Sequence, residues 1–90
     1  MTATNIPRLA RGCRLSEDPG QGWVLLIPEG VLRLSGPGPR ILQRCDGSRT
    51  FGDIVRELGD EFAVADTALV EAETSTFLER LVARHIVVLE

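Results

Sequence analysis

The sequence predicts one α+β domain in which a short antiparallel sheet precedes three helices. Up to residue 35, short apolar runs alternate with turn signals that contain Pro and Gly, which is the pattern of a strand meander. After residue 35 the apolar residues recur at helical spacing. Ninety residues suffice for one hydrophobic core but leave little volume for a deep substrate cavity as well.

Three strands are expected in the first part of the chain. Residues 13–16 alternate between apolar and polar, as a half-buried strand does, and Asp18-Pro19-Gly20 supplies the turn that follows. The apolar run 23–27 predicts a strand covered on both faces. Pro28-Glu29-Gly30 is the second turn, and 31–34 is the third strand.

The first two helices are predicted from their boundary signals. We expect the first to begin after Ser35, a suitable N-cap, and to end at Asp46-Gly47, where glycine suits a left-handed cap. The second begins at Thr50, with Asp53 placed to complete a capping box. Its apolar residues have amphipathic spacing: Phe51, Ile54, Val55, Leu58 and Phe62.

The third helix is expected from about Asp66, its N-cap, to about Ala83. Glu73 and Thr74 interrupt its apolar stripe, which consists of Leu69, Val70, Phe77, Leu78, Leu81 and Val82. The β-branched run 86–89 predicts a final short strand. This order of elements is that of a winged helix-turn-helix with an N-terminal three-stranded antiparallel sheet.

The domain organisation is expected to be simple. Residues 1–7 are polar and have no periodicity, so we expect a flexible N-terminal tail. The remaining residues, 8–90, form a single domain, because no linker or repeat divides them. The longest apolar run has five residues, far fewer than the roughly 20 of a membrane-spanning helix, and no secretory signal is readable. We therefore expect a cytoplasmic protein that binds no membrane.

No group of residues has the spacing of a catalytic, cofactor or metal site. The sequence lacks the GxSxG, HExxH, Walker and GxGxxG motifs. Prolines in the segment 36–39 remove the backbone donors that would cradle a phosphate. Cys13 and Cys45 are far apart in sequence, and His85 is the only imidazole. We expect reduced thiols, no metal, no cofactor and no enzymatic activity.

Three stretches of the sequence resemble the PqqD family: PRLARGCRL (7–15), WVLLIPEGVLRLS (23–35) and ILQRCDGSRTFGDIVREL (41–58). The most specific feature is the PEG turn between two apolar strands, combined with CDG followed by RT. The resemblance implies a RiPP recognition element, which binds the ribosomal precursor peptide PqqA and presents it to the radical SAM enzyme PqqE in pyrroloquinoline quinone biosynthesis. Two departures, GPGP at 36–39 and Arg84-His85 where Gly is common, affect local geometry.

The resemblance also implies that the peptide extends the sheet in the groove between the third strand and the third helix. An edge strand offers unpaired N–H and C=O groups to such a peptide. The candidate peptide-binding residues are therefore Val31, Leu32, Arg33, Leu34, Leu69, Val70, Glu73 and Phe77. The apolar helix residues among them would serve a core equally well. Glu73 either contacts a basic peptide residue or lies at the edge of the stripe, and Arg33 either pairs with an acid or faces water.

Two alternative functions stay open on the sequence: recognition of the leader peptide of another pathway, and DNA binding. The net charge of −3 and the carboxylates Asp66, Glu71 and Glu73 early in the third helix argue against nucleic acid. A monomer or a weak homodimer is expected, because an open strand edge can also pair two copies.

Overall fold

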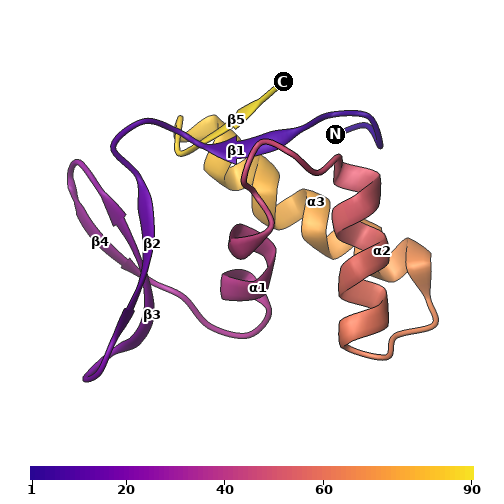
Figure 1. Cartoon of the computed structure of the whole chain (residues 1–90), viewed down its shortest axis with the longest axis horizontal. Helices are drawn as coiled ribbons and strands as arrows, with labels where there is room; N and C mark the ends of the chain where they lie inside the picture. Colours follow the sequence, from indigo (N-terminus) through magenta and orange to yellow (C-terminus); the bar gives the residue numbers. More distant parts are fainter.

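The computed structural model describes residues 1–90 and contains two antiparallel sheets and three helices (Figure 1). The predicted α+β plan, with three strands, three helices and a closing strand, is confirmed, and one additional strand precedes it. The elements are β1 (Pro7–Leu9), β2 (Arg14–Asp18), β3 (Gly22–Ile27), β4 (Gly30–Arg33), α1 (Gly38–Gln43), α2 (Phe51–Glu61), α3 (Thr67–Ala83) and β5 (Val87–Leu89).

The three-stranded sheet has the order β2-β3-β4, with both neighbouring pairs antiparallel. The turn after β2 forms because the Asp18 carboxylate accepts hydrogen bonds from the N–H groups of Gly20 and Gln21, at 2.7 and 3.0 Å. On the central strand Val24 and Leu25 point to opposite faces, and both are buried. The expectation of a strand covered on both faces is thus confirmed at its centre.

A second sheet, of two strands, joins the two ends of the chain. Pro7 pairs with Leu89 and Leu9 with Val87, so β1 and β5 lie together across the top of the molecule in Figure 1. The sequence did not indicate β1, because three residues that begin with proline show no alternation. Beyond the strand, Ile6 and Glu90 exchange two backbone hydrogen bonds of 3.0 and 2.9 Å.

We expected residues 1–7 to form a flexible tail, but Ala3 and Asn5 lie against the start of α2 and Pro7 belongs to β1. The first N–H groups of a helix have no partner within the helix. Here the N–H of Phe51 donates to the carbonyl of Asn5 at 2.7 Å, and that of Gly52 to Ala3 at 3.0 Å. The segment thus caps α2 in the structure, and its mobility in solution stays a prediction.

The side-chain caps of α2 and α3 are confirmed. At α2 the N–H of Asp53 donates to the Thr50 hydroxyl and the N–H of Thr50 donates to the Asp53 carboxylate, both at 3.1 Å. This pairing holds the pKa of Asp53 below its usual value, mainly through the hydrogen bonds from Thr50. At α3 the Asp66 carboxylate accepts from the N–H of Leu69 at 3.1 Å.

The predicted boundaries of the first helix were wrong. Its N-cap is Pro37, which has no side-chain cap, and Ser35 contributes only its backbone carbonyl, to the N–H of Gly38 at 3.2 Å. The helix ends at Gln43, before the predicted stop. Gly47 is left-handed as predicted, with φ of +82°, but it lies in the loop beyond the helix.

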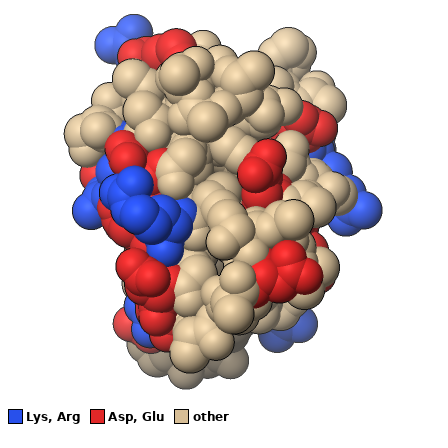
Figure 2. Space-filling model, turned by 90° about the vertical axis from the view of Figure 1, so that its right-hand side faces the viewer, with Lys and Arg blue, Asp and Glu red and all other residues tan.

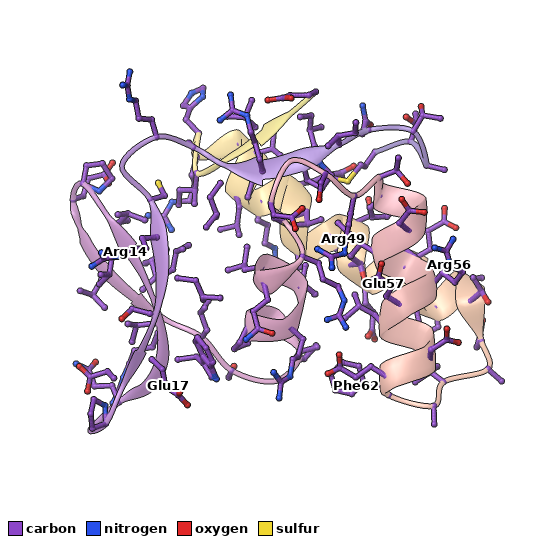
Figure 3. All side chains as sticks on the ribbon, viewed as in Figure 1. Arg14, Glu17, Arg49, Arg56, Glu57 and Phe62 are labelled. Carbon is purple, nitrogen blue, oxygen red and sulfur yellow. The ribbon has the colours of Figure 1, made fainter.

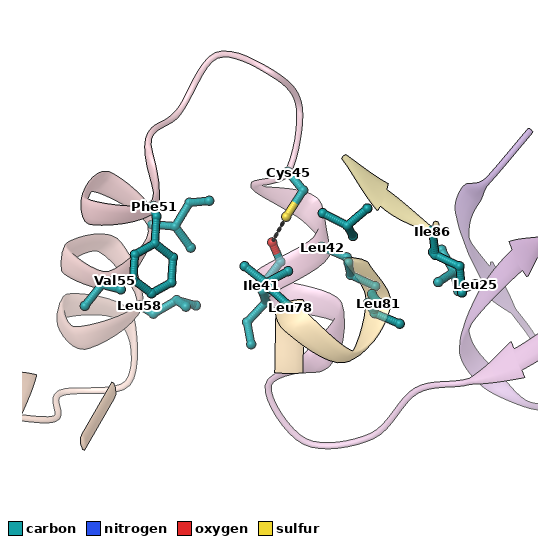
Figure 4. Packing of buried hydrophobic residues seen from close by; sticks show 12 residues of the cluster. Leu25, Ile41, Leu42, Cys45, Phe51, Val55, Leu58, Leu78, Leu81 and Ile86 are labelled. Atoms are coloured by element: carbon teal, nitrogen blue, oxygen red, sulfur yellow. Dashed lines mark hydrogen bonds between the residues drawn. The ribbon is translucent and has the colours of Figure 1, made fainter. Parts of the chain in front are cut away.

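The hydrophobic core joins the three helices, β5 and the central strand of the larger sheet (Figure 4). It contains Leu25, Ile41, Leu42, Cys45, Phe51, Ile54, Val55, Leu58, Leu78, Leu81, Ile86 and Val87. No buried polar side-chain atom lacks a hydrogen-bond partner. None of the helices combines the length and the apolar character needed to cross a membrane.

Ion pairs join α1 and the loop that follows it to α2. Arg44, which is largely buried, contacts Glu57 at 3.0 Å and Glu61 at 2.5 Å. Arg49 contacts the same Glu57 at 3.1 Å, and the two side chains lie between the helices in Figure 3. Arg40 contacts Glu61 at 3.1 Å. A connected network of this kind fixes the relative position of the helices more firmly than isolated surface pairs do.

Both long helices end in a Schellman motif without glycine. At the end of α3, His85 donates its N–H to Val82 and Ile86 donates to Leu81, at 3.0 and 2.9 Å. His85 occupies the left-handed position with φ of +61°, and Ala63 occupies the same position after α2 with φ of +53°. Residues with a Cβ atom are disfavoured in this conformation.

Replacing the left-handed histidine with glycine should therefore stabilise the fold. We expect His85→Gly to raise the free energy of unfolding by about 0.5–1 kcal/mol, because glycine removes the steric penalty at this φ. Urea unfolding followed by circular dichroism measures the change. Arg84→Gly is the matched control: its φ of −95° is ordinary, so glycine there should destabilise. Equal changes in unfolding free energy for the two substitutions would contradict a left-handed conformation at His85.

The two cysteines should differ in reactivity. Cys45 is buried and its thiol donates to the carbonyl of Ile41 at 3.4 Å, whereas Cys13 is half-buried. Burial raises the pKa of Cys45 to about 12, and burial together with Glu29 raises the pKa of Cys13. Only the thiolate reacts, and access limits it further. In folded protein at pH 8 we expect a disulfide reagent to label Cys13 first, and Cys45 only after urea is added. Equal labelling rates in native buffer would show that Cys45 is accessible.

Candidate functional site

The strand β4 has a partner on one side only. It pairs with β3 and lies at the end of the β2-β3-β4 order. Residues opposite each other in an antiparallel pair alternate between hydrogen-bonded and non-hydrogen-bonded pairs. The N–H of Leu34 donates to the carbonyl of Trp23 at 3.1 Å, which fixes the phase of this alternation. Leu32 and Leu34 therefore bond to β3, and Val31 and Arg33 direct their N–H and C=O groups to the open edge.

The side chains of β4 divide between the two faces of the sheet. Leu32 and Leu34 are half-buried and pack against the hydrophobic core. Val31 and Arg33 point to the opposite face, where Val31 is 52% exposed and Arg33 faces solvent without an ion-pair partner. An added strand would thus meet two leucines on one face and Val31 and Arg33 on the other.

A cleft of about 420 Å³ lies between the segment after β4 and α3. Its walls come from four parts of the chain and are mostly apolar: Ser35, Gly36, Pro37, Gly38, Ile41, Leu58, Phe62, Val64, Val70, Glu73, Thr74 and Phe77. A shallower depression of about 310 Å³ continues along α3 and is lined by Ala72, Glu73, Thr76, Phe77 and Arg80. The two hollows adjoin at Glu73 and Phe77, which border both, and together they are called the α3 groove.

The structure brings three of the eight predicted site residues into the α3 groove: Val70, Glu73 and Phe77. The four residues of the strand do not line the groove, but its end is close by. A Cβ atom built on Gly38 would lie 3.4 Å from the Phe77 ring and 3.9 Å from the Cβ of Leu34. Leu69 is 49% exposed and lies outside the groove. The expectation that Leu69 lines the groove wall was therefore wrong, and its contact with a peptide stays a prediction.

Sequence reasoning missed residues at the turn between α2 and α3. Phe62, expected on the buried face of α2, lies at the end of that helix, as Figure 3 shows, and lines the cleft together with Val64. Its side chain is 46% exposed. The helix ends at Glu61 with Phe62 as its C-cap, and the left-handed Ala63 turns the chain, so Val64 does not continue the helical spacing. Conversely, Thr74, which interrupts the apolar stripe in the sequence, is buried in the cleft wall. A left-handed alanine gives no sequence signal, so the turn geometry could not be predicted.

The groove offers apolar contact surface and a few charges. No group of three or more His, Cys, Asp or Glu side chains is placed to hold a metal ion. Glu73 and Arg80 are its only charged side chains, and neither forms an ion pair. With the open edge of β4 beside it, the arrangement suits an extended apolar segment with few charges.

Comparison with solved structures defines the class of this domain. The solution structure of a PqqD truncation of the PqqCD protein of Methylobacterium extorquens, described as a functional and stand-alone RiPP recognition element, superposes with a TM-score of 0.82. The two chains are 31% identical, and the match covers 98% of this chain and 94% of the other. The fold is thus that of a RiPP recognition element, related to the winged helix-turn-helix.

Family comparison identifies the particular group. The model described as "Coenzyme PQQ synthesis protein D (PqqD)" matches residues 22–87. This chain belongs to the PqqD family.

Curated relatives agree with this assignment. A PqqA binding protein of Xanthomonas axonopodis pv. citri is 38% identical over 82 residues, which cover 90% of this chain and 88% of the relative. A PqqA binding protein of Azotobacter vinelandii is 38% identical over 79 residues, with 87% and 84% covered. These relatives are named for binding rather than for a reaction.

The cleft wall and the core should respond differently to truncation. We expect Phe51→Ala to cost about 3–5 kcal/mol of unfolding free energy, because the side chain is fully buried. Phe62→Ala should cost about 1 kcal/mol or less, since nearly half of that side chain already faces water. Thermal and urea unfolding of both variants checks this. A large loss of unfolding free energy for Phe62→Ala would show that this side chain packs as a core residue.

Proposed function

We propose that this protein binds the precursor peptide PqqA by strand addition to β4 and presents it to the radical SAM enzyme PqqE in pyrroloquinoline quinone biosynthesis. The observation that carries the proposal is the vacant edge at Val31 and Arg33 beside the α3 groove. The relatives named as PqqA binding proteins support the choice of peptide.

Backbone pairing at the edge supplies only part of the binding energy. Val31 and Arg33 offer two N–H and two C=O groups, and each net hydrogen bond contributes about 0.5–1.5 kcal/mol. Four such bonds give about 2–6 kcal/mol, whereas micromolar affinity requires about 8 kcal/mol. The remainder, and the cost of ordering the peptide, must come from apolar burial, at about 1.5–3 kcal/mol per large side chain. The cleft bordered by Val70 and Phe77 supplies that surface.

The short length of the binding element supports the presentation step of this proposal. Four residues of β4 pair with roughly 13 Å of an extended peptide. The rest of the peptide stays outside the groove and is free to enter the active site of a partner enzyme. In this role the protein is a non-enzymatic chaperone that needs no cofactor and acts in the cytoplasm as a monomer or a weak homodimer. PqqE carries out the chemistry, and the residues of this chain hold and orient the peptide.

Removing one outward backbone donor should weaken peptide binding without unfolding the sheet. Val31→Pro deletes an N–H that bonds to nothing in the free protein, and proline is tolerated on an edge with that N–H toward solvent. We expect the dissociation constant for synthetic PqqA, measured by isothermal titration, to rise about three- to tenfold. An unrelated leader peptide, titrated in parallel, tests whether the protein serves another pathway.

Two further variants control this experiment. Val31→Thr keeps the donor and the β-branched shape, so its affinity should stay close to that of the unmodified protein. Leu32→Pro removes an N–H that faces β3, so it should lower the stability of the hairpin. Unchanged PqqA affinity of Val31→Pro would exclude pairing at β4. Binding of the unrelated leader but not of PqqA would favour the other pathway.

A further inference from the structure

The arginines of the chain divide into paired and unpaired groups. Five of them contact carboxylates: Arg8, Arg40, Arg44, Arg49 and Arg56. The other five form no ion pair: Arg11, Arg14, Arg33, Arg80 and Arg84. The unpaired arginines lie on the sheet, on the loop before it and at the C-terminal end of α3.

Three acidic side chains near the start of α3 are also without an ion-pair partner. Asp60, Glu71 and Glu73 form no ion pair either, and they surround the turn between α2 and α3 and the first half of α3. Figure 2 views the molecule from the α2 side, where acidic side chains flank a strip of uncharged surface and blue side chains mostly adjoin red ones. Of these three acids only Glu73 lines the α3 groove, so the groove has one unpaired acid toward the start of α3 and one unpaired base, Arg80, toward its end.

Glu73, Phe77 and Arg80 line the groove in this order along α3. They follow each other at spacings of four and three residues, so all three lie on one face of α3. Glu73 and Arg80 are about 10 Å apart along the helix axis, too far to neutralise each other, with the Phe77 ring between them.

Nothing else on α3 neutralises these two charges. Arg80 and Arg84 have the same sign at a spacing of four residues, which is mutually unfavourable. The neighbouring Thr76 hydroxyl donates to the backbone carbonyl of Ala72 at 2.9 Å, so that hydroxyl proton is already engaged. Glu79 is engaged with the N-terminal ammonium at 2.7 Å and with Ser75 at 3.1 Å. A ligand in the groove therefore meets one free acid and one free base.

We infer that the α3 groove selects a peptide segment in which a basic, an apolar and an acidic residue occupy alternate positions. In an extended strand the side chains that face α3 are two residues apart, at about 6.6 Å, so positions 1, 3 and 5 span about 13 Å. The basic side chain pairs with Glu73, the apolar one packs on Phe77, and the acidic one is within reach of the long Arg80 side chain. The same three residues in the reverse order also satisfy the pattern, when the peptide lies along α3 in the opposite direction. This inference rests on the proposed function and gives the chemistry of the peptide that the groove accepts.

The test combines protein and peptide variants. Each charged residue of synthetic PqqA is reversed in sign, one at a time, and each peptide is titrated against the unmodified protein and against Glu73→Arg and Arg80→Glu. Exposed ion pairs are weak, so we expect each protein reversal to raise the dissociation constant about three- to tenfold at low salt, and less at 0.5 M salt. Reversing one basic peptide position should rescue Glu73→Arg, and reversing one acidic position should rescue Arg80→Glu.

Matched controls lie on the same helix. Glu71 lines a depression on the other side of α3, and Arg84 lines none, so Glu71→Arg and Arg84→Glu should leave affinity nearly unchanged. The inference is supported if the two rescuing positions are four residues apart with an apolar residue midway. If PqqA binds but no single position rescues, or the rescuing positions have another spacing, the inference fails and the proposed function stands. If PqqA does not bind the unmodified protein, both fail.

Discussion

The hydrogen-bond phase of the β3–β4 hairpin is the constraint on which the site depends. Because the N–H of Leu34 bonds to Trp23, the backbone groups of Val31 and Arg33 must face away from the sheet. A shift of one residue would turn those groups inward and would also place Leu32 and Leu34 in water. The same register thus fixes both the vacant donors and the apolar face that anchors the strand to the core.

The rest of the molecule holds this edge beside a helix without covering it. Ion pairs from Arg44 and Arg49 join the first two helices, and the core joins both to α3 and to the sheet. Gly38 lies between the Phe77 ring and the end of β4, within van der Waals distance of both. The cleft between them has a mostly apolar wall in the structure without any ligand.

Much of the fold could be predicted from the sequence, because its signals are local. The capping box at Thr50, the Asp66 cap and the Asp18 turn depend on side chains a few residues from the groups they bond. Neither the β1 strand nor the end of α1 could be predicted. The β1 strand forms only because it pairs with the distant C-terminal strand. In the candidate site, the resemblance implied the groove, and helical spacing put Val70 and Phe77 on the face of α3 that lines it. Helical spacing did not indicate that Phe62 lines the cleft or that Leu69 lies outside it, because spacing does not tell where a helix turns away from its neighbours.

Amide hydrogen exchange at Val31 and Arg33 tests the central claim most directly. In the free protein these two amides should exchange rapidly, whereas those of Leu32 and Leu34 should be protected by the hairpin. Addition of saturating synthetic PqqA should slow Val31 and Arg33 markedly and leave the other two little changed. Protection of Val31 and Arg33 before any peptide is added, or no change after saturation, would show that the edge is not a receptor for an extended segment.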